Sequence, residues 1–291
     1  MSREEVTEFA PAKVNLTLRV GQAREDGYHP LDSMVVFANW GDSVRVRSDE
    51  GLMLSMSGEA SRALSGQSDN LVLKAARLLQ KASGVSTGAL IHLEKNIPVS
   101  AGLGGGSADA AATLRALNTL WDTGWSQDEL AQLALTLGAD VPACIYSRPL
   151  RMRGIGEWIE LLDNFPSFHA VIVNPGIPVS TAEVFKRFDQ SGPRKLIEAA
   201  PMGGKVLDWV KSEPNDLEKI ACAMSPEITK ALESLQALEG VTLARMSGSG
   251  ASCLALVEDR QTAERIINNS TGFAVAVELA GVETGTLEVA L

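Results

Sequence analysis

The sequence predicts an α+β protein of two domains, and three observations lead to this fold class. Residues 13–20 alternate apolar and polar side chains, which is the period of a half-buried strand. A glycine run at 102–106 opens into an alanine-rich helix. The segment 241–280 has the pattern strand, turn, strand, helix, strand, with several helical stretches before it, which favours helices on one face of an antiparallel sheet. A length of 291 residues accommodates two modest domains.

The other elements of the N-terminal half follow from local signals. Asn39-Trp-Gly-Asp42 has the composition of a turn between two short strands. Asp69-Asn70 is a helix start, and Ser126-Gln-Asp-Glu129 has the spacing of a capping box for a helix that Gly138 ends. We therefore expect strands at 33–38, 43–48, 52–56 and 87–95, and helices through 71–82, 110–121 and 130–137.

In the C-terminal half, an apolar strand is expected at 169–174, followed by a helix that begins at the capping box Ser180-Thr-Ala-Glu183. The further expected segments are helices at 193–200, 204–211, 216–223 and 226–239, strands at 241–246, 252–257 and 273–280, and a helix at 261–269. The boundary between the domains is expected between Gly154 and Pro166, which gives domains of 1–156 and 157–291.

Composition narrows the class of protein. The net charge of −10 argues against a nucleic-acid-binding surface, although Lys13, Lys95, Arg151 and Arg153 remain candidates for a local basic pocket. The three widely spaced cysteines favour a reducing compartment over a disulfide framework or a zinc site. We expect a cytoplasmic protein, because the chain starts without a leader pattern and has no apolar run of membrane-spanning length.

The glycine run predicts a phosphate-binding loop. Glycine stands at 102, 104, 105 and 106, Ser107 follows, and Ala110, Leu114 and Leu117 continue at helical spacing. The backbone N–H groups at a helix N-terminus lack partners, and the helix dipole there favours an anion. A Walker A loop is excluded because no lysine precedes Ser107, and the dinucleotide fingerprint fails because Ser107 takes the place of its third glycine. The alternative is a loop that serves only as a tight connection.

Two charged residues are candidates for chemistry at this loop. Lys13 begins the alternating strand and shares a polar face with Asn15, although a lysine in such a place is usually a solvated surface charge. Asp140 precedes Pro142 at a helix junction, where it is either a helix cap or a base that accepts a proton from a substrate hydroxyl.

Two turns are less specific. Asp26-Gly-Tyr-His-Pro30 presents an aromatic ring and an imidazole, either for a ligand or for packing at the domain edge. Arg245-Met-Ser-Gly-Ser-Gly-Ala-Ser252 is a plain hairpin turn or an anion-binding nest.

Taken together, these segments make the chain resemble the GHMP kinase superfamily over nearly its full length. The resemblance is carried by Pro11-Ala-Lys-Val-Asn-Leu16, Asp26-Gly-Tyr-His29, Ile97-Pro-Val-Ser-Ala-Gly-Leu-Gly-Gly-Gly-Ser-Ala-Asp109, Gly138-Ala-Asp-Val-Pro142 and Met246-Ser-Gly-Ser-Gly-Ala251. The first, second and fourth of these narrow it to the members whose substrate is a cytidine-diphosphate-linked methylerythritol. The resemblance implies an N-terminal ribosomal-protein-S5-like domain, a C-terminal ferredoxin-like α/β sandwich and a site between them.

The resemblance also implies an ATP- and Mg²⁺-dependent kinase acting on an alcohol group, with no nucleic-acid or membrane partner, as a monomer or weak homodimer. Asp140 matches the catalytic aspartate and Lys13 its cationic partner. Tyr28, His29 and Phe185 match the cytosine contacts, and Asn15 and Thr181 match polar substrate contacts. The nucleotide contacts implied are Asn70, Lys95, Pro98, Gly102, Leu103, Gly104, Gly105, Gly106 and Ser107, and Ser107 is also the candidate Mg²⁺ ligand.

One segment departs from the family pattern. A glycine-rich stretch is common after Ala-Asp-Val-Pro, whereas this chain has Tyr146-Ser-Arg-Pro-Leu-Arg-Met-Arg153, and the contacts of Arg148, Arg151 and Arg153 stay open. Two alternative functions also stay open: a GHMP kinase for another alcohol, such as mevalonate or homoserine, and a catalytically inactive nucleotide sensor. Tyr28, His29 and Phe185 argue against the first, and the presence of both Lys13 and Asp140 argues against the second.

Overall fold

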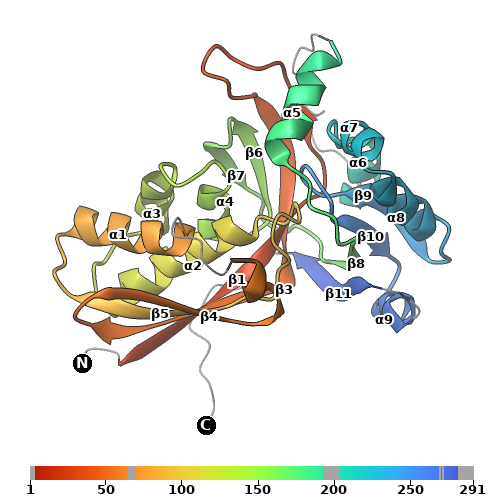
Figure 1. Cartoon of the computed structure of the whole chain (residues 1–291). Coiled ribbons are helices and arrows are strands. Elements are labelled where there is room, and N and C mark those ends of the chain that lie inside the picture. Colours follow the sequence, from red (N-terminus) through yellow and green to blue (C-terminus); the bar gives the residue numbers. More distant parts are fainter. Residues whose placement is uncertain (1–3, 65–69, 193–203, 269, 271, 281–291) are drawn as a thin grey trace.

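The computed structural model describes residues 4–64, 70–192, 204–268, 270 and 272–280, and in this part of the chain eleven strands form one mixed sheet (Figure 1). The main strand order is β4-β5-β3-β11-β8-β10-β9; β1, β2 and β6 also pair with β3, and β7 pairs with β6. The strands are β1 (Glu5–Asn15), β2 (Arg19–Val20), β3 (Leu31–Asp49), β4 (Leu52–Ser57), β5 (Gly88–Glu94), β6 (Leu150–Gly154), β7 (Trp158–Leu161), β8 (Phe168–Asn174), β9 (Val241–Met246), β10 (Cys253–Val257) and β11 (Phe273–Ala280). This mixture of elements confirms the predicted α+β class.

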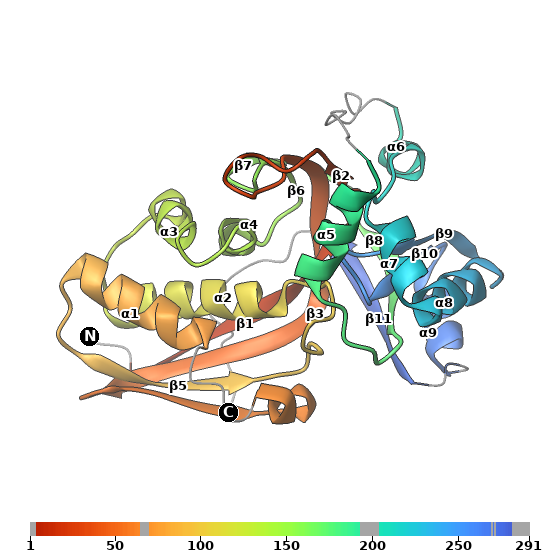
Figure 2. The same ribbon diagram turned by 45° about the horizontal axis from the view of Figure 1, so that its top comes forward.

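The helices form two groups, one over each half of the sheet (Figure 2). The described helices are a 3₁₀ turn η1 (Glu59–Leu64), α1 (Leu71–Ser83), α2 (Gly105–Leu120), α3 (Gln127–Ala134), α4 (Val141–Tyr146), α5 (Thr181–Gln190), α6 (Val206–Ser212), α7 (Glu218–Met224), α8 (Pro226–Gln236) and α9 (Arg260–Asn268). The glycine-loop helix α2 packs on β1 and β3 and is flanked by α1 and α4. The helix expected at 193–200 lies outside the described residues.

The predicted turn at 39–42 is wrong, because these residues lie inside the single long strand β3. Their polar groups are satisfied within the sheet instead of in a turn. The Asp42 carboxylate accepts the backbone N–H groups of Asn96 and Ile97, and Gly41 lies opposite Pro11 where an added Cβ would clash with the Ala10 carbonyl. Of these turn-forming residue types, Gly41 allows a close contact between strands and Asp42 is a buried ion-pair partner.

The strand predicted at 13–20 is interrupted between β1 and β2, so only part of the alternating segment forms a strand. Asn15 ends β1, and the backbone N–H of Leu18 donates to the Pro214 carbonyl at 2.8 Å. The Leu18 carbonyl in turn accepts the N–H of Asp216 at 2.8 Å. The chain therefore leaves β3 to pair with a segment from the C-terminal half.

The C-terminal sheet β11-β8-β10-β9 is antiparallel, and both of its faces are buried. Val171 and Ala255 point toward the helices α5, α7, α8 and α9. Their sequence neighbours Ile172 and Leu254 point the other way, into a core shared with β1, β3 and α6. The sequence predicted helices on one face of this sheet. It did not predict that strands would cover much of the opposite face, because those strands are far from the C-terminal half in the sequence.

The sheet is continuous across the predicted domain boundary. Two residues at the end of β11 pair with Ala38 and Phe37 of β3, and β6 pairs with β7 on either side of position 156. The division into 1–156 and 157–291 therefore stays a prediction. The two groups of helices thus lie over different halves of one continuous sheet.

Local start signals are mostly confirmed. Ser126 and Glu129 form both halves of the capping box of α3. At α5 only the Ser180 half is made, because the Glu183 carboxylate pairs with Arg187 at 3.1 Å. None of the described helices is both long and apolar enough to cross a bilayer.

Candidate active site

The glycine loop lies between β5 and α2 and presents an uncapped helix N-terminus. Gly104 is the N-cap residue, with a φ of 63° and no side-chain cap bond, so helix geometry leaves the first-turn N–H groups of Gly105, Gly106 and Ser107 without helical acceptors. An added Cβ on Gly105 would lie 2.9 Å from Lys95 Nζ, and one on Gly104 would lie 3.0 Å from Lys13 Cβ. The left-handed φ of Gly104 favours glycine, and a side chain at Gly105 would have to displace the Lys95 ammonium.

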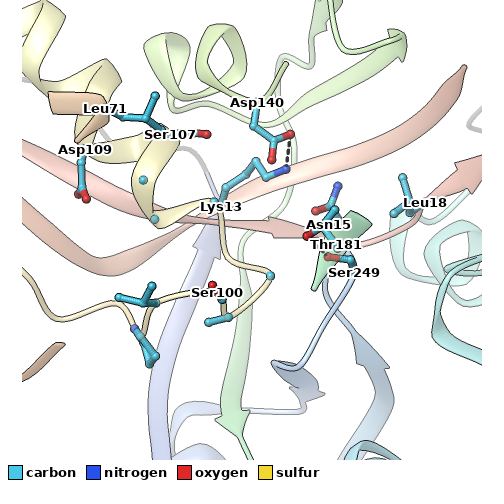
Figure 3. A pocket seen from close by; sticks show the side chains of 18 of the residues that line it. Lys13, Asn15, Leu18, Leu71, Ser100, Ser107, Asp109, Asp140, Thr181 and Ser249 are labelled. Atoms are coloured by element: carbon cyan, nitrogen blue, oxygen red, sulfur yellow. Dashed lines mark hydrogen bonds and ion pairs between the residues drawn. The ribbon is translucent and has the colours of Figure 1, made fainter. Parts of the chain in front are cut away.

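Lys13 and Asp140 form an ion pair beside this loop (Figure 3). The Lys13 Nζ atom lies 2.7 Å from an Asp140 carboxylate oxygen. The solvated alternative for Lys13 is wrong, because the residue is 3% exposed and its backbone N–H donates to the Leu103 carbonyl. The cap alternative for Asp140 is also contradicted, because Asp140 occupies the N-cap position of α4 without making a side-chain cap bond. Its carboxylate is instead partly open to the cavity.

A cavity of about 430 Å³ brings together most of the residues that the sequence nominated. It is lined by Lys13, Asn15, Asn70, Lys95, Pro98, Gly102, Gly104, Gly105, Gly106, Ser107, Asp140, Thr181 and Phe185, together with others. The lining residues come from both halves of the chain, and Figure 3 shows Asn15 of β1 close to Thr181 of α5 and to Ser249. Residues far apart in sequence thus share one concave site, which is the usual form of a small-molecule site.

Three of the residues that the family resemblance nominated do not line this cavity. The Leu103 side chain is buried in the core, so only its backbone could serve a ligand. Tyr28 is 55% exposed on the connection between β2 and β3. His29 packs against the lining residue Phe185, with the ring centroids 4.6 Å apart and the ring planes tilted by 39°.

Lys95 is held by two carboxylates that the sequence did not nominate. It is ion-paired with Asp42, and its Nζ lies 3.0 Å from Asp109, which is 3% exposed and also lines the cavity. Burial lowers the Lys95 pKa, but the two carboxylates outweigh it and raise that pKa above its ordinary value. Burial raises the Asp109 pKa well above the usual carboxyl range; the Lys95 charge opposes this rise, and the Asp42 charge adds to it. The sequence feature that could have identified Asp109 as a site residue is an Asp on the alanine-rich face of a helix.

The turn 247–250 packs directly on the glycine loop. The Ser247 hydroxyl accepts the Asn15 backbone N–H at 3.2 Å and donates to the Gly102 carbonyl at 3.0 Å. Ser249 lies 2.8 Å from the Thr181 hydroxyl, and both line the cavity. The turn is therefore more than a plain hairpin connection, and Ser249 is a site residue that the sequence did not single out.

The basic residues of the divergent segment face acidic partners. Arg151 makes two contacts with the buried Asp32, at 2.8 and 2.6 Å. Arg148 pairs with Asp163 and Arg153 with Glu160, both at the surface. None of these three arginines lines the cavity. Of the four residues that the sequence nominated for a basic pocket, Lys13 and Lys95 line the cavity.

Family descriptions match both halves of the chain. "GHMP kinases N terminal domain" matches residues 70–148, and "GHMP kinases C terminal" matches residues 207–271. Among curated proteins, the 4-diphosphocytidyl-2-C-methyl-D-erythritol kinase of Parvibaculum lavamentivorans is 45% identical over 286 residues, which is 95% of this chain and 98% of that protein. The kinase of the same name from Rhizobium etli is 45% identical over 89% of this chain and 88% of its own length.

Solved structures agree on the fold. A crystal structure of 4-(cytidine 5'-diphospho)-2C-methyl-D-erythritol kinase matches with a TM-score of 0.78 and 34% identity, covering 95% of this chain and 100% of that one. A homoserine kinase from Cytophaga hutchinsonii matches with a TM-score of 0.68 and 17% identity over 99% of this chain and 98% of its own, which shows the fold alone. The expected GHMP kinase fold is therefore confirmed. The chain belongs to the GHMP kinases and, within them, to the family of the 4-diphosphocytidyl-2-C-methyl-D-erythritol kinases.

Proposed function

We propose that the protein transfers the γ-phosphoryl group of ATP to the 2-hydroxyl of 4-diphosphocytidyl-2-C-methyl-D-erythritol, which gives the 2-phosphate and ADP. This is a step of the non-mevalonate route to isoprenoid precursors, and we place it in the cytoplasm. The observation that carries the proposal is the Lys13–Asp140 ion pair, which lines the same cavity as an uncapped glycine loop. The relatives at 45% identity support the choice of substrate.

The glycine loop fits the phosphates of a nucleoside triphosphate. The first-turn N–H groups of α2 and the helix dipole favour phosphate oxygens, and the close packing at Gly104 and Gly105 leaves backbone, not side chains, facing the cavity. Asn70 and Lys95 line the nucleotide side of the cavity in this proposal. The Asn70 side chain also caps α1 by accepting the Val72 N–H at 2.8 Å, which fixes its position.

Among the described residues, the side chains that line the cavity form no metal centre by themselves. The described residues hold no group of three or more His, Cys, Asp or Glu side chains placed for a metal ion. This fits Mg²⁺ carried by the triphosphate, because Mg²⁺ at such sites uses one or two protein oxygens and keeps its phosphates and waters. Ser107 lines the cavity and would be the protein ligand, and the ion would neutralise charge on the transferred phosphoryl group.

Asp140 is the proposed base. Its carboxylate is free of cap bonds and partly exposed, so it can accept the proton of the 2-hydroxyl as the oxygen attacks phosphorus. The Lys13 ammonium holds this carboxylate in place at 2.7 Å and provides a positive charge beside the developing phosphoryl negative charge. Proton acceptance and charge stabilisation thus come from one ion pair.

The substrate end of the cavity belongs to the C-terminal half and to β1. We propose that Phe185 stacks on the cytosine, with Tyr28 and His29 at its edge, and that Asn15 and Thr181 contact the methylerythritol. Asn15 Oδ1 is buried and has no hydrogen-bond partner among the described residues, so an acceptor is available for a substrate hydroxyl. We retain the monomer or weak homodimer as part of the proposal.

Turnover of three alcohols tests the function. The purified protein with ATP and Mg²⁺ is offered the cytidyl substrate, mevalonate and homoserine at equal concentrations, with ADP release as the measurement. We expect turnover with the cytidyl substrate and at least about 10²-fold lower kcat/KM with the other two, because neither offers a base for Phe185. Preference for mevalonate or homoserine would move the protein to another GHMP activity, and no turnover with any alcohol would favour the inactive sensor.

A further inference from the structure

A hydrogen bond joins the loop before β3 to helix α5 at the edge of the cavity. The His29 Nε2 atom lies 2.9 Å from an Asp189 carboxylate oxygen. The His29 ring packs against Phe185 in a tilted arrangement at a centroid distance of 4.6 Å and meets Phe188 edge-on at 6.2 Å. The imidazole is therefore fixed in position and in rotation, with its side chain only 10% exposed.

The contact with Asp189 also determines where the imidazole proton lies. An ionised carboxylate only accepts hydrogen bonds, so Nε2 carries the hydrogen that is donated to Asp189. In the neutral imidazole the other nitrogen, Nδ1, then has a lone pair and is an acceptor. No described residue makes a hydrogen bond to Nδ1. Asp189 therefore leaves His29 with one available acceptor.

Pyrimidine bases differ in the group that such an acceptor can recognise. Cytosine has an exocyclic amino group, which donates, where uracil has a carbonyl oxygen, which accepts. An imidazole acceptor can accept a hydrogen bond from the cytosine amino group. With uracil, the carbonyl oxygen would face the imidazole lone pair, and uracil would bind more weakly because a buried polar group is left unsatisfied.

We propose that Asp189 is a positioning residue that sets the preference for cytosine over uracil by holding His29 as the Nε2–H tautomer. This inference rests on the proposed function, in that it places the substrate base beside Phe185 and His29. In this proposal, the discrimination between bases depends on Asp189 of α5, which acts only through the His29 imidazole.

The test compares two substitutions of Asp189 with a matched control. In D189N, the amide N–H can donate to Nε2 and so move the histidine proton to Nδ1; in D189A, the tautomer is no longer fixed. The control is E183Q, the same acid-to-amide change on the same helix. The Glu183 side chain is 39% exposed, against 40% for Asp189, and pairs with Arg187 instead of a histidine.

Affinities for CDP and UDP are measured by calorimetry, which needs no turnover. We expect the parent and E183Q to bind CDP more tightly than UDP, and D189A and D189N to lose about tenfold or more of that preference. The ¹⁵N signals of the His29 imidazole should also shift in D189N, whereas a purely structural role for Asp189 would leave the tautomer unchanged. An unchanged CDP/UDP ratio in both Asp189 variants overturns the inference.

Steady-state kinetics with the cytidyl substrate separate this inference from the proposed function. We expect the Asp189 variants to raise KM for that substrate and to leave kcat and the KM for ATP within about twofold. If the parent shows no turnover but its CDP/UDP preference depends on Asp189, the proposed function fails and the inference stands. If the parent turns over and the preference does not depend on Asp189, the inference fails and the function stands.

Discussion

The Lys13 ammonium at the end of β1 lies 2.7 Å from the Asp140 carboxylate at the start of α4, and the two meet beside the N-terminus of α2. The pair is asymmetric, because the Lys13 side chain is 4% exposed whereas the Asp140 side chain is 39% exposed. A buried cation thus holds an accessible carboxylate at the wall of the cavity. This arrangement suits a base that must meet a substrate from solution.

Replacing Asp140 by Asn tests the base. The amide keeps the shape of the side chain but accepts a proton far less readily, so we expect kcat to fall by about 10²-fold or more. The melting temperature should fall, because D140N leaves the buried Lys13 ammonium facing a neutral amide in place of its carboxylate partner. Calorimetry of ATP binding serves as the control and should be unaffected. Near-parental turnover by D140N would remove Asp140 from the chemistry.

A bulky residue at Gly105 tests the phosphate loop. In Gly105→Val the added side chain meets Lys95 Nζ and Ile97 and displaces the loop, so ATP binding should be lost. Gly51→Ala is the matched control, because an added Cβ there meets no atom within 4 Å. Calorimetric titration with ATP in the presence of Mg²⁺ is the measurement. Normal ATP affinity in Gly105→Val would make the loop a structural connection.

Phe185→Ala tests recognition of the base. Loss of stacking costs about 1–3 kcal/mol, so KM for the cytidyl substrate should rise roughly tenfold to a hundredfold. The ring also packs on His29, so part of this loss reflects a less ordered imidazole. Phe185→Tyr, which keeps the ring, should restore most of the affinity, and KM for ATP should stay constant in both. Equal KM values in Phe185→Ala and the parent would refute base stacking at this position.

Cysteine alkylation tests the burial of the thiols at the two cores. Burial raises the pKa of Cys144 and that of Cys253 to about 12, so at pH 8 only about one molecule in 10⁴ carries either thiolate. Cys222 is half-buried, and burial also raises its pKa. With iodoacetamide at pH 8, mass spectrometry should find slow labelling at Cys222 alone, and labelling of all three cysteines after denaturation. Rapid native labelling of Cys144 would contradict the packing of α4.

The sequence by itself determined the local features of this protein. Four glycines and Ser107 before an alanine-rich segment predicted a helix that begins at a glycine loop, and Gly104, with its left-handed φ, is the N-cap of that helix. The capping box at Ser126 and the hairpin of β9 and β10 follow equally from near neighbours in the chain, whereas the pairing of β8 with β10 and β11 joins distant segments. Family resemblance carried the nominated residues, and most of them line one cavity.

Only the tertiary structure decided which distant side chains pair. Asn39–Asp42 had the composition of a turn, yet they lie within β3, where Asp42 meets Lys95 across the sheet. The contact of His29 with Asp189 depends in the same way on how α5 packs beside the loop before β3. Local propensity acts over a few residues, whereas the burial of a charge is favourable only when a partner from elsewhere in the fold meets it. The pairs that position this site are therefore properties of the packing, not of any one segment.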